Sequence, residues 1–391
     1  MKRIFISVGE ISGDNYAFEL VKRLKEKYYI TGIAGPKMRA AGINPVANIE
    51  DISVVGITEA LSKYKEIKQV FKKSVEELKK GVDLLIVVDF PGFNIKLLKE
   101  AKKIGIKTVY FISPQVWAWG KGRVKDIVAN TDVLISILPF EEEIYRPYVS
   151  DKFKFFYVGH PLLDIIKTQE TQDSFKEKLS IPKNKRIVGL LCGSRESEVN
   201  TLLPTMLQSA KILSRTFENV HFVIPATVNM VEKVLEKTKD YKDLPISVIT
   251  SNLSQKNIPK FENPSYEVMK NSIFSIVASG TATLEASIIK NPFILVYKVS
   301  PITFFIGKML VNIKYLGLPN IILGKQVVPE LLQEKCNPLE IANKTLEFLT
   351  DEELRENQKK EFERLKSILG EKGAIDRTYN IISKLLETGQ V

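Results

Sequence analysis

The sequence has 391 residues, of which 44% are hydrophobic and 26% charged, so two globular domains with sizeable cores are expected. Lys and Arg number 57 against 46 Asp and Glu, a formal net charge of +11. This balance favours phosphorylated substrates or an anionic membrane surface as partners. No nucleic-acid motif accompanies it, so we expect no DNA or RNA ligand.

Cysteine and histidine are too scarce for a disulfide framework or a histidine-based zinc centre. The chain has two of each: Cys192, Cys336, His160 and His221. We therefore expect a reducing compartment and no metal site. Residues 2–8 already have the pattern of a strand, so no secretion signal is expected. No apolar run approaches the roughly 18 residues of a membrane span. The expectation is a cytoplasmic protein, at most peripheral to a membrane.

The first predicted strand opens into a glycine turn, and a helical stretch follows over residues 15–28. The turn lacks the GxGxxG pattern of dinucleotide-binding folds, so that function is not supported. Its candidate cleft residues are Gly9, Glu10, Ser12, Gly13 and Asp14. For Ser12 and Asp14, capping of the following helix explains the residue type equally well.

Residues 57–80 have helical periodicity with five lysines between Lys63 and Lys73. Such a helix can lie on an anionic membrane, or it can pack on a sheet and turn a solvated lysine face outward. The apolar run 83–88 predicts a buried parallel strand, and Asp89 follows it directly. Ligands gather at the carboxyl ends of such strands, so Asp89 is a candidate general base. The alternative is an N-cap for a helix over 94–105.

Both tryptophans of the chain lie in the loop Ser113-Pro114-Gln115-Val116-Trp117-Ala118-Trp119, after a predicted strand at 107–112. Their rings can stack on sugars, anchor acyl chains, or simply fill a core. Further strands are expected at 132–137 and 155–158. After the latter, His160 either donates a hydrogen bond to an anion or is a structural turn residue.

Residues 164–186 are polar and lysine-rich and are predicted to form a linker. The strand–helix alternation restarts at 187–191, which indicates a second α/β domain. The following Gly193-Ser194-Arg195 resembles a phosphate-binding turn, in which Arg195 can neutralise a diphosphate with its planar guanidinium group.

A second turn of this kind links a strand at 271–276 to a helix at 284–290. A helix N-terminus with free backbone N–H groups suits a diphosphate, and Glu285 can accept bonds from ribose hydroxyls. The alternative is an ordinary capped helix. The turn's candidate ligand residues are Ser279, Gly280, Thr281, Ala282 and Thr283.

The apolar stretch 300–311 is too short to span a bilayer, and it predicts core, subunit interface or a surface for acyl chains. From residue 338 the chain is predicted to be helical. The expected division is 1–168, a Rossmann-like acceptor-binding domain; 185–345, a Rossmann-like UDP-sugar-binding domain; and 346–391, a helical segment.

Taken together, the motifs resemble one family, the lipid-A-disaccharide synthases. The resemblance rests on nine pieces that follow one another along nearly the whole chain: residues 9–14, 89–94, 113–119, 138–141, 158–162, 193–195, 279–285, 318–320 and 328–331.

The resemblance implies an α/β fold with two Rossmann-like domains and a cleft between them, the GT-B type of glycosyltransferase. It implies transfer of a sugar from UDP-2,3-diacylglucosamine to the 6-hydroxyl of 2,3-diacylglucosamine 1-phosphate. Inversion at the anomeric carbon gives a β-1,6 link, with lipid A disaccharide 1-phosphate and UDP as products. It also implies a homodimer, with exchange of C-terminal segments, at the cytoplasmic face of the inner membrane.

The resemblance assigns roles to the candidate residues. Asp89 is the base and Arg195 stabilises departing UDP, so no metal and no cofactor are expected. Candidates on the acceptor side of the cleft are Gly9, Glu10, Ser12, Gly13, Asp14, Asn94, Gln115, His160, Asn320 and Glu330. Two alternatives stay open: an epimerase or peptidoglycan glycosyltransferase acting on a soluble UDP-sugar, and a non-catalytic nucleotide-sugar or membrane-binding module.

Overall fold

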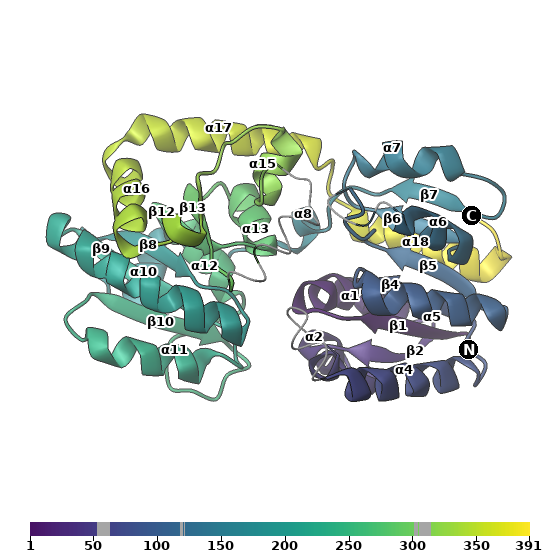
Figure 1. The fold of residues 1–391 in the computed structure, drawn as a ribbon. Coiled ribbons are helices and arrows are strands. Elements are labelled where there is room, and N and C mark those ends of the chain that lie inside the picture. The colour runs from purple at the N-terminus through teal and green to yellow at the C-terminus, as the bar shows by residue number, and fades with distance from the viewer. Residues whose placement is uncertain (53–62, 118–119, 121, 301–303, 305–313) are drawn as a thin grey trace. The chain divides into compact units, whose positions relative to one another are not determined.

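A computed structural model gives the fold of the chain (Figure 1). It describes residues 1–391 except 53–62, 118–119, 121, 301–303 and 305–313. The start of the predicted helix 57–80, Trp119 and nearly all of the apolar stretch 300–311 therefore lie outside the described residues. By its internal contacts the chain divides into two compact units. The first takes Met1–Ile165 and Leu369–Val391, and the second is built from described residues between Ile166 and Ile368.

The first unit is a seven-stranded parallel sheet with strand order β3-β2-β1-β4-β5-β6-β7. Its strands are β1 (Arg3–Val8), β2 (Tyr29–Ala34), β3 (Asn44–Asn48), β4 (Leu84–Val88), β5 (Lys107–Phe111), β6 (Val133–Ser136) and β7 (Lys154–Tyr157). Its helices are α1 (Ile11–Leu24), α2 (Pro36–Ala40), α4 (Tyr64–Leu78), α5 (Pro91–Lys103), α6 (Arg123–Asn130), α7 (Glu141–Tyr145), α8 (Leu162–Ile165) and α18 (Ala374–Thr388).

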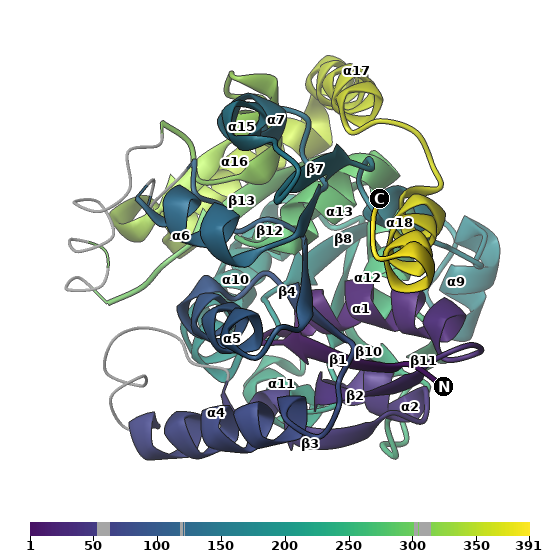
Figure 2. The ribbon, with the colours of Figure 1, turned by 90° about the vertical axis from the view of Figure 1, so that its right-hand side faces the viewer.

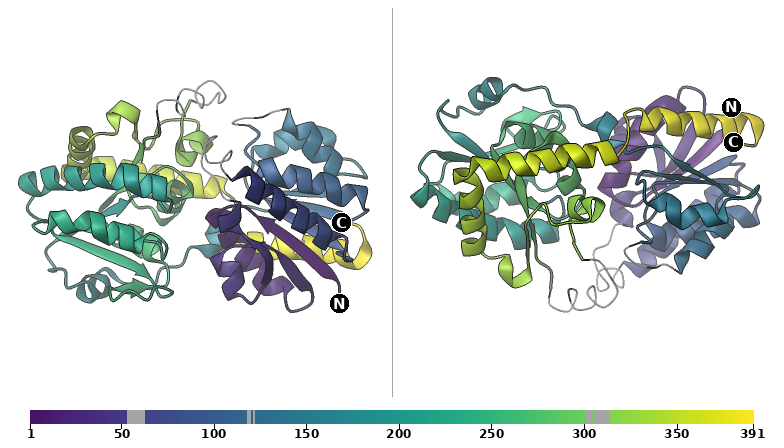
Figure 3. Two further views of the ribbon diagram at one scale, coloured as in Figure 1. Left: turned by 60° about the horizontal axis from the view of Figure 1, so that its bottom comes forward. Right: turned by 90° about the horizontal axis from the view of Figure 1, so that it is seen from above.

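The second unit repeats this plan with strand order β11-β10-β9-β8-β12-β13-β14. Its strands are β8 (Arg186–Leu191), β9 (Val220–Ala226), β10 (Ile246–Ser251), β11 (Lys260–Phe261), β12 (Phe274–Ala278), β13 (Phe293–Tyr297) and β14 (Glu330–Leu332). Its helices are α9 (Gln172–Lys178), α10 (Glu196–Thr216), α11 (Val231–Thr238), α12 (Pro264–Asn271), α13 (Thr281–Ile289), α15 (Leu318–Leu323), α16 (Pro338–Thr350) and α17 (Glu352–Ile368), the last two prominent in Figure 3.

The central strands form because their sequences are runs of aliphatic residues, which a parallel sheet buries on both faces. All five residues of β4, Leu84–Val88, are buried, and so are all five of β12, Phe274–Ala278. Helices cover both faces of each sheet. In the second unit, two separate apolar clusters line the two faces. The two sheets are therefore rigid platforms for the loops at their edges.

The last helix, α18, belongs to the first unit although it comes after the whole second unit in sequence. It lies beside α1 (Figure 2), and Arg23 of α1 pairs with Asp376 at 2.6 Å. The Asp164 carboxylate accepts hydrogen bonds from the backbone N–H groups of Gly373 and Ile375, at 2.6 and 3.1 Å. The expected helical segment 346–391 is thus distributed over both units.

Two sequence expectations need correction. The segment 164–186 contains a helix, α9, which Thr171 caps by accepting from the Ser174 backbone N–H at 3.3 Å. Helix α5 begins at Pro91 rather than at Asn94, because proline's fixed φ suits the first helical position. Among the described residues, no helix is both long enough and apolar enough to cross a membrane.

Candidate active site

The loops predicted to carry function lie where the strand order of each sheet reverses. In the first unit this point is between β1 and β4, and the loops at 9–14 and 89–94 follow those strands. In the second unit it is between β8 and β12, and the loops at 193–195 and 279–283 follow those. Open α/β sheets bind their ligands at such points, outside the carboxyl ends of the strands.

The backbone of the Asp89 loop is held in an unusual conformation. Asp89 and Phe90 have φ values of 44° and 49°, in the left-handed region that costs a non-glycine residue about 1–2 kcal/mol. The Asp89 carbonyl accepts hydrogen bonds from Asn94 Nδ2 at 2.8 Å and from the Tyr110 hydroxyl at 2.9 Å. Ser7 Oγ of β1 donates to Asn94 Oδ1 at 2.7 Å. Three elements thus fix the residue expected to act as base.

The surroundings of Asp89 suit a base that works near neutral pH. They raise the pKa of its carboxyl to about 7, first through burial and second through the negative charge of Glu10. A hydrogen bond from the Phe90 backbone N–H opposes this rise. Tyr110 lies against the same carboxyl, and burial followed by the Asp89 charge raises the pKa of its hydroxyl. The alternative role of Asp89, as N-cap of the following helix, does not apply, because Phe90 is the N-cap of α5.

The glycine turn after β1 contains one residue that faces the Asp89 loop and one that is structural. A Cβ on Gly9 would overlap the Phe90 ring, so only glycine lets this ring pack where it does. Asp14 is 1% exposed, and its carboxylate accepts from the backbone N–H groups of Gly35, Lys37 and Met38. It therefore holds the start of α2, a helix other than the one expected. Ser12 and Gly13 lie in the first turn of α1.

The remaining first-unit candidates differ in exposure. Asn94 is fully buried and positions the backbone of Asp89, whereas Gln115 is exposed to solvent. His160 is 3% exposed, and its Nδ1 accepts from the Leu162 backbone N–H at 3.2 Å. Burial lowers the pKa of His160 to about 3. Of the two sequence interpretations of His160, this geometry matches the structural turn residue.

A buried polar cluster beside Asp89 was not apparent from the sequence. Ser136 ends β6, Glu141 begins α7, and their side chains are hydrogen-bonded. Tyr145 shares a hydrogen bond of 2.9 Å with Ser113 Oγ at the start of the tryptophan loop. Trp117 packs edge-on against Phe140, with ring centroids 5.3 Å apart. In the sequence, the only indication of this cluster is a polar residue, Ser136, at the end of an apolar strand.

In the second unit, Glu198 organises the turn after β8. Its Oε2 accepts from the backbone N–H groups of Ser194 and Arg195 at 3.0 and 3.3 Å, and Arg195 Nη1 donates to Oε1 at 3.2 Å. Gly193 has φ 98°, and a Cβ there would overlap Glu198. Tyr297 ends β13 close by. Burial and then the charge of Glu198 raise the pKa of its hydroxyl, and the charge of Arg195 opposes this rise. Glu198 and Tyr297 are site residues that the sequence interpretation missed.

The turn after β12 presents the N-terminus of α13. Gly280 is exposed with φ 145°, and Ser279, Thr281 and Ala282 are partly exposed. Thr283 is buried, and its hydroxyl donates to the Gly280 carbonyl at 2.8 Å, so this hydroxyl is bonded within the turn itself. One turn into the helix, Glu285 Oε1 accepts from the Tyr266 hydroxyl of α12 at 3.1 Å.

Asn320 and Glu330 form a hydrogen-bonded pair in the second unit. Asn320 is fully buried, and its Oδ1 accepts from the backbone N–H groups of Val327 and Val328, both at 2.8 Å. Its Nδ2 donates to Glu330 Oε1 at 2.8 Å, and the same carboxylate accepts from the Leu316 and Gly317 N–H groups. These contacts fix the chain just before α15.

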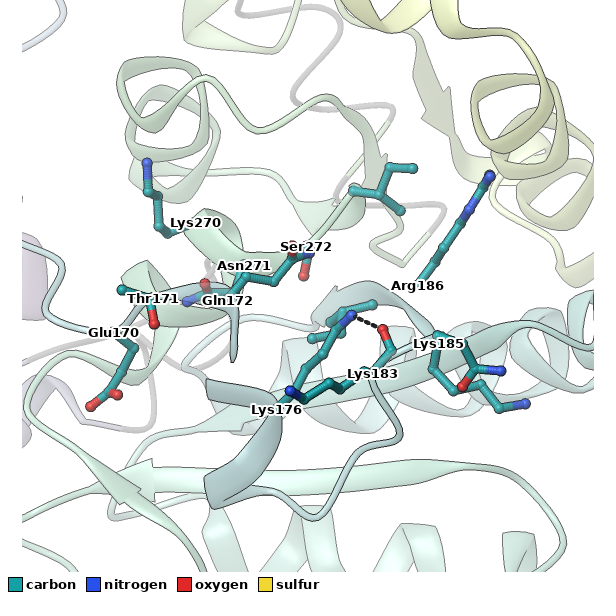
Figure 4. A pocket seen from close by; sticks show the side chains of 13 residues that line it. Glu170, Thr171, Gln172, Lys176, Lys183, Lys185, Arg186, Lys270, Asn271 and Ser272 are labelled. Atoms are coloured by element: carbon teal, nitrogen blue, oxygen red, sulfur yellow. Dashed lines mark hydrogen bonds between the residues drawn. The ribbon is translucent and has the colours of Figure 1, made fainter. Parts of the chain in front are cut away.

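A hollow of about 430 Å³ lies at the opposite, amino-terminal end of the strands of the second sheet, where β8 begins (Figure 4). Lys176, Lys183, Lys185, Arg186 and Lys270 line it. The charged ends of Lys185, Arg186 and Lys270 point away from one another, and Lys176 Nζ donates to the Lys183 carbonyl at 2.7 Å. This hollow is thus separate from the loops at the switch point and is not built for a shared anion.

No group of three or more His, Cys, Asp or Glu side chains suited to a metal ion occurs among the residues that the structure describes. The positive features of the site are instead Arg195 and the N-terminus of α13. Both can interact with a diphosphate.

Three comparisons relate the chain to known proteins. Residues 4–380 match the family model described as "Lipid-A-disaccharide synthetase". A lipid-A-disaccharide synthase of Sulfurihydrogenibium sp. (strain YO3AOP1) is 75% identical over 390 residues, covering all of both chains. A UDP-GlcNAc 2-epimerase from Neisseria meningitidis, solved with UDP-GlcNAc, has a TM-score of 0.64 at 12% identity and covers 98% of this chain and 100% of its own. MurG from Acinetobacter baumannii has a TM-score of 0.53 at 14% identity and covers 98% and 100%. These two structures support the predicted GT-B class of fold.

Proposed function

This chain belongs to the lipid-A-disaccharide synthase family, and on that premise we propose how its residues carry out the reaction. It is a glycosyltransferase of lipid A biosynthesis that joins UDP-2,3-diacylglucosamine to 2,3-diacylglucosamine 1-phosphate. The acceptor's 6-hydroxyl oxygen bonds to the anomeric carbon of the donor. The bond from that carbon to the diphosphate oxygen breaks, and UDP leaves with the electron pair. The hydroxyl proton must go to a base.

Asp89 is the proposed base, and its environment is the observation that carries this assignment. A pKa of about 7 means that the carboxyl is substantially ionised at neutral pH yet basic enough to take a proton. The hydrogen bonds from Asn94 and Tyr110 to its carbonyl support a fixed position for the carboxylate. Glu10, Ser12 and Gln115 are proposed to contact the acceptor sugar. Asp14, Asn94 and His160 then act indirectly, by shaping the loops.

The second unit is proposed to bind UDP. The N–H groups at the start of α13, with the Ser279 and Thr281 hydroxyls, suit the diphosphate, and Glu285 suits the ribose. Arg195 would stabilise the charge that develops on UDP as the bond breaks. Because these groups supply the positive charge, we propose that no metal and no cofactor take part. Treatment with EDTA should then leave turnover within about twofold.

We also propose that the protein associates peripherally with the cytoplasmic face of the inner membrane, where its lipid substrates lie. Helix α4 supports this, because it buries Val70, Ser74 and Leu78 and leaves four lysines exposed: Lys65, Lys68, Lys72 and Lys73. Each such lysine near an anionic surface contributes about 1 kcal/mol. Co-sedimentation with anionic but not neutral vesicles, reduced by added salt, would test the association.

A homodimer with exchanged C-terminal segments is a further proposal. Helix α18 packs on α1 through the Arg23–Asp376 pair, and an exchanged helix would make the same contacts with a second copy. Light scattering coupled to size-exclusion chromatography would test this, since a monomeric mass at assay concentrations would contradict it.

The direct test compares Asp89→Asn with the wild type in detergent micelles, using both lipid substrates. The amide cannot take the proton, so we expect disaccharide formation to fall roughly 10²–10⁴-fold while UDP binding is kept. Asp126→Asn is the matched control, because Asp126 is an exposed carboxylate of the same unit that pairs with Lys99. Full activity of Asp89→Asn would exclude Asp89 as the base. A wild type that binds UDP but makes no disaccharide would contradict the reaction itself.

A soluble-substrate epimerase or peptidoglycan glycosyltransferase is not favoured as the function. The structural likeness to such enzymes comes with only 12–14% identity, which speaks for the shared fold alone.

A further inference from the structure

Glu141 is the most deeply buried carboxyl group near the proposed base, and the reaction described above gives it no role. Its side chain is 1% exposed at the start of α7. Taking an ionised carboxylate out of water is unfavourable unless a cation pairs with it, and no ion pair with Glu141 occurs among the described residues. A neutral carboxylic acid avoids this cost.

The hydrogen bonds around Ser136 also fit a neutral acid, provided that the serine hydroxyl donates to the Leu138 carbonyl. Ser136 Oγ contacts the Leu138 carbonyl at 3.0 Å and is hydrogen-bonded to Glu141 Oε2. A hydroxyl has a single proton to donate. If Ser136 gives that proton to the Leu138 carbonyl, the proton of the other bond must come from Glu141. The carboxyl then donates through Oε2 and keeps Oε1 as an acceptor.

Oε1 of Glu141 and the indole nitrogen of Trp117 are complementary and unused. Both atoms are buried, and neither has a hydrogen-bond partner that meets strict geometry in the described part of the chain. The two side chains are nevertheless close enough for the indole N–H to lower the pKa of the carboxyl. One group is only a donor and the other is an acceptor, so a small side-chain rotation would pair them.

We propose that Glu141 is a positioning residue of the acceptor site: as a neutral acid it bridges Ser136 and the Trp117 indole, and so fixes residues 113–117 of the tryptophan loop. The loop also carries exposed Gln115, a proposed acceptor contact, and its Ser113 is tied to Tyr145 of α7. Fixing Trp117 would also hold Gln115, two residues before it, in a defined position. The effect of this bridge on catalysis rests on the proposed function, whereas the bridge itself does not.

The electrostatic surroundings agree with this role. The pKa of Glu141 is raised to about 8, chiefly by burial and also by the charge of Asp89, while its contacts with Ser136, Trp117 and the Leu138 backbone oppose the rise. Tyr145 of α7 interacts electrostatically with Glu141. In the wider cluster Glu10 interacts with Asp89, and both Asp89 and Arg123 interact with Tyr110. Asp89 therefore ionises before Glu141 as the pH rises.

The experiment compares Glu141→Gln with Glu141→Leu, each in a Trp119→Phe background so that Trp117 is the sole tryptophan. The amide mimics a neutral acid, as it has one donor and one acceptor end, whereas leucine has neither. We expect Glu141→Leu to lower kcat/KM for the acceptor roughly 10–100-fold and to shift the Trp117 emission, with UDP binding unchanged. Glu141→Gln should stay within about threefold, with the wild-type emission and the same acid limb of the pH profile.

Glu142→Leu is the matched control, because Glu142 is the next residue of α7 and pairs on the surface with Arg146. The proposal is overturned if Glu141→Leu keeps wild-type acceptor kinetics and emission, or if Glu141→Gln loses as much as Glu141→Leu. If Glu141→Leu does not fold, Ser136→Ala is the test. A shifted Trp117 emission and a higher KM for the acceptor would support the bridge, and wild-type values of both would refute it. A wild type without disaccharide synthesis would remove the proposed function, while the emission series would still test the bridge.

Discussion

At the scale of single residues, the carboxyl group of Asp89 gains its basicity from its position. A carboxylate in water has a pKa near 4 and would be a weak base for a sugar hydroxyl. Burial and Glu10 raise the pKa of Asp89 to about 7. The backbone φ of 44° that holds it there is itself unfavourable, and the bonds from Asn94 and Tyr110 offset part of this strain.

This basicity predicts the pH dependence of turnover. Only the ionised carboxylate can accept a proton, so kcat/KM for the acceptor should fall about tenfold per pH unit below about 7 and level off above it. Rates measured from pH 5 to 8 with saturating donor would check this. The control Asp126→Asn should keep the same profile. A rate that is flat across this range would rule out a base with the pKa of Asp89.

Gly9 predicts a second residue-scale effect. In Gly9→Ala the new methyl group would overlap the Phe90 ring, which must move and take Asp89 with it. We expect kcat to fall roughly 10²-fold, since a displacement of about 1 Å has that effect on a positioned group. UDP binding should not change.

Gly92→Ala is the control for that substitution. It lies two residues after Phe90, in the first turn of α5, and a Cβ there meets nothing within 4 Å. It should behave as wild type. Wild-type kcat in Gly9→Ala would show that the Phe90 ring yields without disturbing the base.

At the scale of elements, the turn between β8 and α10 depends on one glutamate. Glu198 binds the Ser194 and Arg195 backbone N–H groups and the Arg195 side chain, but its negative charge opposes a bound diphosphate. These two effects can be separated. Glu198→Gln keeps an acceptor and removes the charge, so UDP should bind as well or more tightly. Glu198→Ala also loses the order of the loop, so the Kd of UDP should rise roughly 5–20-fold.

Titration calorimetry with UDP would measure both variants, with Glu196→Ala as the control. Glu196 is the first residue of α10 and pairs on the surface with Lys233. If Glu198→Ala bound UDP more tightly than Glu198→Gln, repulsion by the carboxylate would outweigh its ordering of the turn.

Elements were also the level at which the sequence was most informative. The aliphatic runs at 83–88 and 187–191 and the glycine turns after them predicted where strands end and ligand loops begin. The order of the strands could not be predicted in the same way, because it depends on contacts between distant segments. That order is what brings the loop after β1 beside the loop after β4.

The roles of polar residues were the hardest to predict. The sequence suggests Asp14 as a cleft residue, yet its carboxylate accepts hydrogen bonds from three backbone N–H groups at the start of α2. Glu141 follows a Leu-Pro-Phe turn and gives no sign in the sequence that it is buried. In both cases the partners lie on elements whose placement requires the tertiary structure.

At the scale of the whole molecule, the first unit depends on the end of the chain. Arg377 of α18 donates to the Val158 carbonyl from Nε at 2.9 Å and from Nη2 at 2.7 Å, and also to the carbonyls of Glu371 and Lys372. The two bonds to Val158 join α18 to the turn that contains His160. They are charge-assisted and partly buried, so they belong to the stronger class.

Arg377→Ala should therefore weaken the first unit specifically. We expect the free energy of its unfolding to fall by about 2–4 kcal/mol, and hydrogen exchange to accelerate in α18 and around residue 160 but not in the second unit. Lys384→Ala, on an exposed position of the same helix, should change neither. Equal loss of protection in both units would show that α18 supports more than the unit it packs on.

The return of α18 to the first unit also has a consequence for synthesis on the ribosome. The N-terminal sheet emerges first, but the helix that covers α1 is translated only after the whole second unit. The side of α1 that packs on α18 stays uncovered until then. Nascent chains stalled before residue 374 should thus hold a first unit that still binds chaperones.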